Sequence, residues 1–186
     1  MGRTRTWRRL DVPGTEDFTD EGLEFHGRVR VQESVPWSAE YRVTFDPDWV
    51  TRSADVSVQH PGGPRHVTVR RDGSGRWFAD DRELESCRGA LDVDLGVTPS
   101  TNTSAIRRLE LPVGGAAELT AAWVRFPELT VEPLRQRYTR LSEHSYRYES
   151  LRENAVVFQA LLEVDASGLV ERYERFFERV DASATG

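Results

Sequence analysis

The sequence predicts a single antiparallel all-β domain. Apolar and polar residues alternate with a period of two through most of the chain, as expected for strands with one buried face. Turns rich in Asp, Gly and Pro separate these stretches at short intervals. The 186 residues are enough for one sizeable domain, which would bury roughly 70% of the surface of the unfolded chain. We therefore treat residues 1–186 as one domain.

Alternation in the first half predicts strands around residues 24–32, 41–45, 54–59 and 67–69. In the first of these stretches Phe25, Val29 and Val31 would face the core, with charged residues between them. A Pro-Gly-Gly-Pro turn at 61–64 precedes the fourth strand, and an Asp-Gly-Ser-Gly turn at 72–75 follows it. Such residues favour tight turns, so these strands should form hairpins.

The middle of the chain, residues 87–111, combines a strand with a dense polar segment. Residues 91–95 alternate, which places Asp92 and Asp94 on one face of the expected strand. Residues 98–104 are mostly Thr, Ser, Asn and Pro and predict a rigid loop, in which Asn102 and Thr101 or Thr103 bond nearby backbone groups. Leu109 and Leu111 would then restart a strand.

The second half continues the pattern at 119–131 and most clearly at 156–164. A turn at Asp165–Gly168 should lead into a short strand through Tyr173 and then a short C-terminal helix, because Phe176, Phe177 and Val180 have helical spacing. We expect the tail, residues 181–186, to be disordered.

The turns at 72–75 and 165–168 share the pattern Asp-x-Ser-Gly and lie half a chain length apart. The strands before them also match in the phase of their apolar residues. An internal duplication is therefore predicted, with two similar repeats at about 1–90 and 91–186.

Composition and charge argue against several classes of function. The formal charge of −6 disfavours nucleic acid as a partner. Cys87 is the only cysteine and the four histidines are scattered, so we expect no metal site and no cofactor. No apolar run approaches the ~20 residues of a membrane span. The Arg-rich N-terminus lacks the apolar segment of a secretory signal, so we expect a cytoplasmic protein.

Asp92 and Asp94 are the candidate catalytic pair if the protein is an enzyme. Alternate residues of a strand lie about 6–7 Å apart, which is compatible with acid and base roles in glycoside cleavage. The alternative is structural: the two carboxylates would be buried, would bond loop amides or Arg107 and Arg108, and would have lowered pKa values.

The aromatic residues have two interpretations. Five Trp, five Tyr and eight Phe lie mostly on predicted strands. Trp side chains offer flat apolar faces to sugar C–H groups together with one N–H donor. Trp49, Trp77 and Trp123 could therefore form a carbohydrate-binding surface, or they could fill the core, as large aromatics usually do.

Several motifs carry a family resemblance over nearly the whole chain. They are Trp49-x-Thr51-Arg52, Asp72-x-x-Gly75-x-Trp77, Asp92-Val-Asp94-Leu, Thr98-Pro99-x-Thr101-Asn102-Thr103, Ile106-Arg107-Arg108-Leu109, Tyr138-Thr139, Tyr146-x-Tyr148 and Val164-Asp165-x-x-Gly168-Leu169-Val170. In these the chain resembles the bacterial family named "Putative glycolipid-binding". It departs from the family at Ser104-Ala105, where Leu-Pro is usual, and at Glu174, where Pro is usual.

The resemblance implies a spiral β-roll built by duplication, with an open hollow similar to that of lipoprotein carriers. It also implies non-catalytic binding of an amphipathic, glycolipid-like small molecule, in glycolipid metabolism or transport. The residues expected to contact the ligand are Trp49, Arg52, Trp77, Asp92, Asp94, Thr101, Asn102, Arg107, Tyr138 and Tyr148. The alternatives are a hydrolase of glycosides or lipid esters and a protein-interaction module that uses an edge strand.

Overall fold

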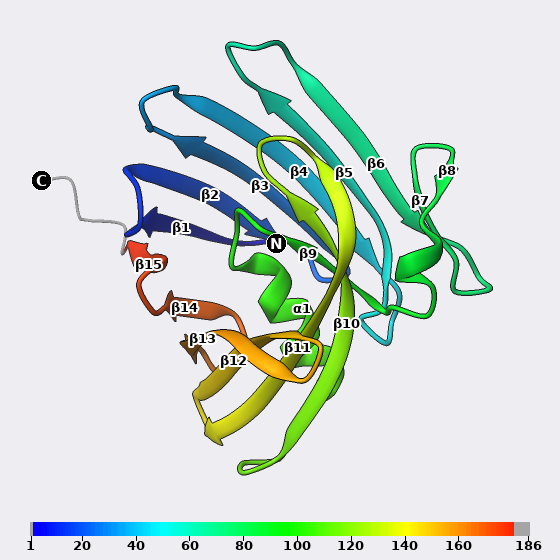
Figure 1. The fold of residues 1–186 in the computed structure, drawn as a ribbon. Coiled ribbons are helices and arrows are strands. Elements are labelled where there is room, and N and C mark those ends of the chain that lie inside the picture. The colour runs from blue at the N-terminus through cyan, green and yellow to red at the C-terminus, as the bar shows by residue number, and fades with distance from the viewer. Residues whose placement is uncertain (1, 181–186) are drawn as a thin grey trace, which may run out of the picture.

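The structure of the protein is a computed structural model that describes residues 2–180. These residues form one 15-stranded, largely antiparallel sheet with one α-helix (Figure 1). The strands are β1 (Arg3–Arg9), β2 (Gly14–Asp20), β3 (Glu24–Val31), β4 (Trp37–Phe45), β5 (Thr51–Gln59), β6 (Arg65–Arg71), β7 (Trp77–Ala79), β8 (Arg82–Glu83), β9 (Asp92–Leu95), β10 (Ala116–Arg125), β11 (Thr130–Ser142), β12 (Ser145–Arg152), β13 (Ala155–Val164), β14 (Val170–Tyr173) and β15 (Phe177–Val180). The helices are the 3-10 turn η1 (Glu85–Cys87) and helix α1 (Ser100–Leu109). The predicted all-β class is confirmed, and the expected tail at 181–186 lies outside the described residues.

Neighbouring strands of the sheet are consecutive in the chain, except that β1 lies beside β15. The sheet runs β8 to β1 and then β15 to β9, so β8 and β9 form its edges. The first and last strands pair antiparallel in the middle of the sheet, where Thr6 lies opposite Val180. Only β9 and β10 pair in parallel among the described strands. The sheet is neither closed nor strongly curled, which corrects the expected curled roll.

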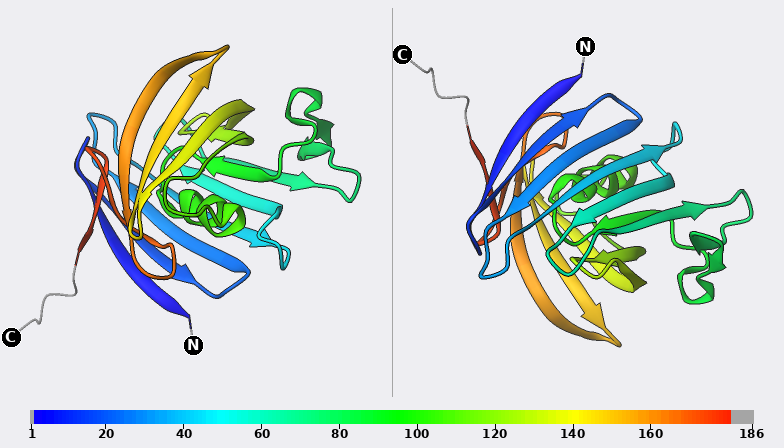
Figure 2. Two further views of the ribbon diagram at one scale, coloured as in Figure 1. Left: turned by 90° about the horizontal axis from the view of Figure 1, so that it is seen from below. Right: turned by 90° about the horizontal axis from the view of Figure 1, so that it is seen from above.

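Helix α1 lies between two parts of the sheet, strands β1–β6 on one side and β10–β13 on the other (Figures 1 and 2). The Thr98 hydroxyl accepts the Ser100 N–H at 3.0 Å and so satisfies a free donor of the first turn. The helix ends at Glu110, whose φ of 45° is left-handed. The predicted loop at 98–104 is therefore wrong from Ser100 onward, and no strand restarts at Leu109.

The polar side chains of α1 explain why a weak helix-forming sequence is helical here. Thr101 accepts the N–H of Leu95 at 3.2 Å, and Thr103 accepts the N–H of Val170 at 3.3 Å. These bonds confirm the expected threonine contacts with the backbone. The Asn102 amide instead donates to the Tyr138 hydroxyl at 2.9 Å, so its expected backbone bond is wrong. Tertiary hydrogen bonds on both sides of the helix outweigh its low intrinsic propensity.

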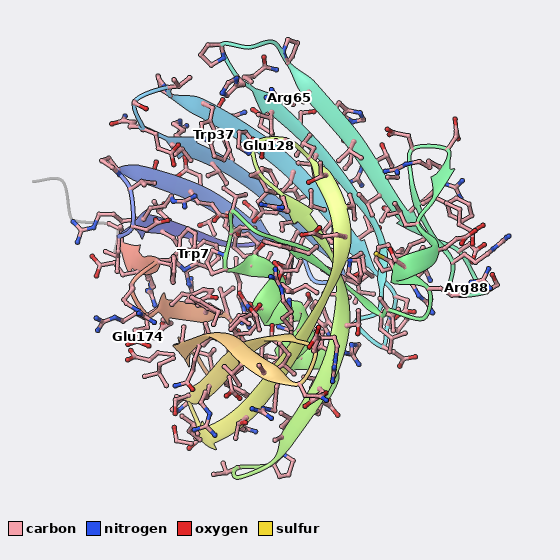
Figure 3. All side chains as sticks on the ribbon, in the orientation of Figure 1. Trp7, Trp37, Arg65, Arg88, Glu128 and Glu174 are labelled. Carbon is pink, nitrogen blue, oxygen red and sulfur yellow. The ribbon has the colours of Figure 1, made fainter. Side chains whose placement is uncertain are left out.

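The predicted C-terminal helix is also wrong. Residues 170–180 form strands β14 and β15, in which Tyr173 lies opposite Phe177. Strand β15 then pairs with β1 and satisfies the backbone groups along that side of β1. Glu174, labelled in Figure 3, lies in the turn between the two strands, where its carboxylate accepts the N–H of Leu161 at 3.0 Å. Backbone pairing outweighs the helical spacing of the aromatics.

The two matched turns join antiparallel strands, as predicted: β6 to β7 and β13 to β14. In each, one Asp oxygen accepts two backbone N–H groups and a Ser hydroxyl, around Asp72 and around Asp165. Asp46 accepts two backbone N–H groups in the same way between β4 and β5. The turn type thus recurs outside the expected pair, and the division into repeats at about 1–90 and 91–186 stays a prediction.

The main core draws on both halves of the chain. Side chains from β1–β7 pack with side chains from β9, β10 and β15, among them the fully buried Trp7, Phe25 and Trp77. A second cluster packs Ile106 of α1 against Tyr138, Tyr148 and neighbours on β11–β14. Helix α1 is therefore anchored in a core of its own.

A buried ion pair joins the end of α1 to β9. Arg108 holds Asp92 through two hydrogen bonds of 2.9 and 2.6 Å, and the Asp92 side chain is only 3% exposed. Replacing Arg108 with Ala leaves that carboxylate buried and unpaired, so we expect the free energy of unfolding to fall by about 3–5 kcal/mol. Urea denaturation checks this. The matched control is Arg28→Ala, which breaks a surface ion pair with Glu40 and should change stability little. Equal losses in the two variants would contradict the prediction.

Candidate functional site: an aromatic cavity beside helix α1

The candidate site is a cavity of about 420 Å³ bordered by β9–β15 and the start of α1. Its volume falls within the usual range for small-molecule sites. Six aromatic residues line it: Trp123, Tyr148, Phe158, Tyr173, Phe176 and Phe177. Several of these rings contact one another, with centroids 5.3 Å apart for Tyr173 and Phe176 and 6.0 Å for Tyr148 and Tyr173. Five of the six rings, all except Trp123, are linked by such contacts into one connected aromatic surface.

One wall of the cavity depends on Gly96. A Cβ atom at this position would lie 2.7 Å from Nε1 of Trp123, closer than real contacts allow. Both residues line the cavity. The absence of a side chain at Gly96 therefore lets the Nε1 edge of the Trp123 indole approach the backbone just after β9.

The polar end of the cavity is built around Asp94. Its Oδ2 accepts a hydrogen bond of 2.5 Å from the Gln136 amide, and Gln136 in turn accepts from the Tyr138 hydroxyl at 3.4 Å. Asn102 donates to the same hydroxyl. Burial raises the pKa of Asp94 to about 6, and the neighbouring charge of Asp92 adds to this effect. The site thus offers one acidic acceptor beside neutral amide and phenol groups.

A second buried acid lies behind the cavity. Glu16 of β2 is fully buried, and its Oε1 accepts from the hydroxyls of Tyr41 at 2.5 Å and Thr98 at 2.7 Å. Its Oε2 has no hydrogen-bond partner among the residues described. Burial raises the pKa of Glu16 to about 7. Tyr41 can lie there because its partner across the strands is Gly27, where a Cβ would overlap the Tyr41 ring at 2.2 Å.

Three of the sequence-predicted ligand residues line the cavity: Asp94, Asn102 and Tyr148. Tyr138 lies directly behind them, bonded to Asn102. Thr101 is buried against the backbone of β9. Their binding role stays a prediction.

Asp92 and Asp94 differ although they belong to one strand. Asp92 is buried and paired with Arg108, which fits the structural alternative, whereas Asp94 faces the cavity. The expected lowering of their pKa values is wrong. Burial raises the pKa of both carboxyls and outweighs Arg108 at Asp92 and Gln136 at Asp94.

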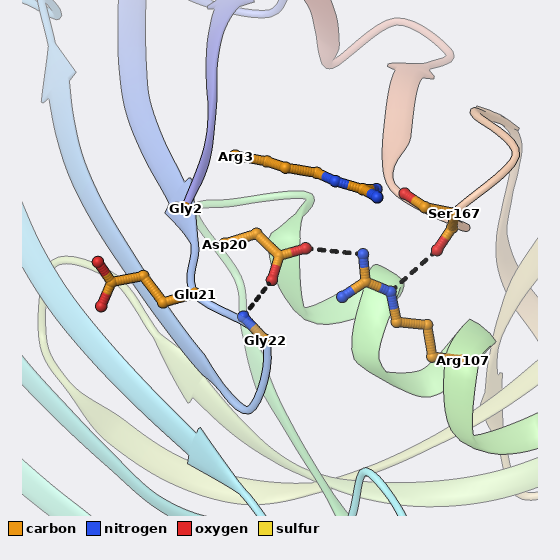
Figure 4. Close-up of a pocket in the computed structure, with 7 residues that line it drawn as sticks. All are labelled: Gly2, Arg3, Asp20, Glu21, Gly22, Arg107 and Ser167. Carbon is orange, nitrogen blue, oxygen red and sulfur yellow. Dashed lines mark hydrogen bonds and ion pairs between the residues drawn. The ribbon is translucent and has the colours of Figure 1, made fainter.

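Arg107 lies at a different place, in an open pocket near the N-terminal strand (Figure 4). The Arg107 guanidinium bonds Asp20 at 2.8 Å and the Ser167 carbonyl at 2.9 Å, as the dashed lines show. It also lies 4.6 Å from the Trp49 ring. These contacts connect α1, β2 and the β13–β14 turn, so they hold the fold together.

The last two predicted ligand residues lie outside the cavity. Trp77 is fully buried and donates to the Ala90 carbonyl at 2.9 Å, as the core interpretation expects. Arg52 is exposed on β5.

Sequence reasoning missed Glu16, Gln136, Phe158 and the C-terminal aromatics of the cavity. Phe158 was visible only as one residue of a regular strand. Tyr173, Phe176 and Phe177 were assigned to a strand end and a helix, which obscured their shared face. Trp123, for which the sequence allows either a core or a binding role, lines the cavity, and its binding role stays a prediction.

One group within residues 2–180 has the composition of a cation site. Glu21, Glu24 and His26 lie within reach of a shared ion on an edge of β3. His26 is 2.5 Å from Glu24, and Arg42 also pairs with Glu24 at 2.5 Å. The Arg42 guanidinium already supplies a positive charge to this exposed cluster.

A family model described as "Putative glycolipid-binding" matches residues 4–179. The chain belongs to this family. It is also similar to the crystal structure of a DUF1089 family protein, PA1994, from Pseudomonas aeruginosa. The two are 36% identical with a TM-score of 0.82, over 89% of this chain and 91% of that one. No curated protein matches the chain. In this member of the Putative glycolipid-binding family, the 15-stranded sheet carries an aromatic cavity.

Glu16 gives stability a specific dependence on pH. Its pKa rises from 4.5 to about 7 on folding, so the folded protein holds this proton more tightly than the unfolded chain. The contribution of Glu16 is therefore fully present below about pH 4.5 and is lost as the pH rises through about 7. We expect Glu16→Gln to be more stable than the wild type at pH 8, by up to about 3 kcal/mol.

Denaturation at pH 5 and at pH 8 measures this, with the exposed Glu40→Gln as the matched control. The prediction is contradicted if the free energy of unfolding changes with pH equally in the wild type and in Glu16→Gln. Glu16 would then ionise freely in the folded state.

Proposed function

We propose that the aromatic cavity binds an amphipathic, glycolipid-like small molecule without catalysis, in glycolipid metabolism or transport. The observation that carries the proposal is the combination of an aromatic wall with a polar region at Asp94 and its amide partner Gln136. An amphipathic molecule likewise has an apolar part and a polar part, which match the aromatic wall and the polar region of the cavity. The family name supports the ligand class. The cytoplasmic location stays a prediction.

The wall suits both parts of such a ligand. Trp123 and Tyr148 present ring faces and polar atoms near Asp94, where sugar C–H and hydroxyl groups can be matched. Leu134, Val157 and Phe158 extend the apolar surface along β11 and β13. An acyl chain there would gain about 0.8 kcal/mol per buried methylene. Tail burial would thus supply affinity, and the polar end would supply orientation.

The geometry favours binding over the hydrolase alternative. A glycosidase of the usual kind needs two carboxyl groups at the scissile bond. Asp92 is buried against Arg108 and does not line the cavity, so Asp94 lacks the partner that the sequence suggested. The interaction-module alternative has little support at β8, an edge strand of two residues.

Phe158 tests the cavity directly. We expect a long-chain alkyl glucoside to bind the wild type saturably and to change its Trp fluorescence, because Trp123 lines the cavity. Phe158→Ala should weaken binding about tenfold through lost apolar contact. The matched control is Phe78→Ala, since Phe78 is also a half-buried strand residue but lies beside Arg70, outside the cavity.

Titration by fluorescence and calorimetry measures these affinities, beside a panel of chromogenic glycosides and esters. Equal affinities for the two variants would place the binding elsewhere. Turnover that disappears in Asp94→Asn, with the fold intact, would favour the hydrolase.

A further inference from the structure

We propose that the ligand of this cavity carries a protonated amine in its head group, which pairs with the Asp94 carboxylate inside the aromatic wall. The ligand class is an alkyl or acyl amphiphile with an ammonium group, such as an amino sugar or a long-chain amine. The inference rests on the proposed function and adds the charge of the head group.

The first support is that Asp94 is a carboxylate without a counter-charge. Its side chain faces the cavity, and its hydrogen-bond partner is the neutral amide of Gln136. Within residues 2–180 no Arg or His forms an ion pair with it. The nearby Arg108 is fully used by Asp92, with two hydrogen bonds to that carboxylate. Asp94 is half-buried, and a carboxylate that is partly removed from water without a counter-charge is costly, so a cation that enters the cavity would lower that cost.

The second support is that Arg9 of β1, a cationic residue that lines the cavity, is already paired with a carboxylate. Arg9 donates from Nε and Nη2 to the two oxygens of Asp11, at 3.1 and 2.7 Å. Arg152, on the opposite side, is exposed to solvent. Among the charged residues that line the cavity, Asp94 is therefore the buried or half-buried one without an ion-pair partner of opposite charge within residues 2–180. A phosphate or carboxylate head group beside it would meet a like charge.

The third support is the aromatic wall itself. Ring faces attract an ammonium group through their negative quadrupole, most strongly for Trp and Tyr. Trp123, Tyr148 and Tyr173 all line the same cavity as Asp94. Burial, together with the charge of Asp94, raises the pKa of Tyr148 and of Tyr173, so their phenols stay neutral. The three rings and the Asp94 carboxylate line one cavity, and this combination favours an ammonium group over an uncharged sugar.

The experiment compares three probes with one tail: dodecylammonium, dodecyl glucoside and dodecyl phosphate, each titrated below its aggregation concentration. At about pH 7.5 we expect dodecylammonium to bind about tenfold more tightly than the glucoside, and the phosphate to bind least. Asp94→Asn should remove the preference for the ammonium probe over the glucoside. Asp81→Asn, an exposed residue outside the cavity, is the matched control and should keep the preference.

A second measurement does not depend on a variant. Ammonium affinity should fall as the pH drops through about 6, where Asp94 takes up a proton, whereas glucoside affinity should stay constant. The charged and titratable groups near Asp94 are Asp92, Tyr138, Tyr148 and Tyr173, with Arg9, Asp11 and Arg152 elsewhere on the lining. Glu16 titrates at about 7 behind Thr98, so the series is repeated in Glu16→Gln.

The outcomes separate the two proposals. Glucoside binding without an ammonium preference, or a preference that survives in Asp94→Asn, overturns the amine inference and leaves the amphiphile proposal standing. Failure of all three probes to bind contradicts both.

Discussion

Two buried ion pairs at the end of helix α1 determine where the helix lies, and the cavity depends on that position. Arg107 is bound by Asp20 of β2, and Arg108 is bound by Asp92 of β9. At the other end of the helix Thr98 bonds Glu16. These contacts reach strands that are far apart in the sheet order. They bring Asn102 and the end of β9 together with the aromatics of β12–β15.

Burial and charge give two neighbouring aspartates different roles. Asp92 has a guanidinium partner that compensates its burial, so it belongs to the fold. Asp94, two residues later, has only an amide partner and faces a cavity. The alternation of residues 91–95 predicts a strand with Asp92 and Asp94 on one face, and β9 is that strand. The difference arises from their partners, which are the guanidinium of Arg108 on α1 for Asp92 and the neutral amide of Gln136 on β11 for Asp94.

Strand alternation was sufficient to predict the all-β class and most of the longer strands, because one-sided burial leaves a period of two in the sequence. It failed where tertiary bonding outweighs local preference. The Ser, Thr and Asn residues at 100–104 form a helix because strands supply partners such as the Leu95 and Val170 N–H groups. Tyr173 and Phe177 lie on strands, with Phe176 in the turn between them, because β1 offers an unpaired side to β15. The cavity combines both segments, so only part of it, at Asp94, Asn102 and Tyr148, could be predicted.

The central claim is that the cavity buries the apolar tail of an amphiphile, and a tail-length series tests it most directly. Alkyl glucosides that differ by single methylenes are titrated by calorimetry. Each added methylene should raise affinity about fourfold, equivalent to about 0.8 kcal/mol, until the cavity is filled and the affinity levels off. The binding heat capacity should be negative throughout the rising part. An affinity independent of tail length would contradict the account.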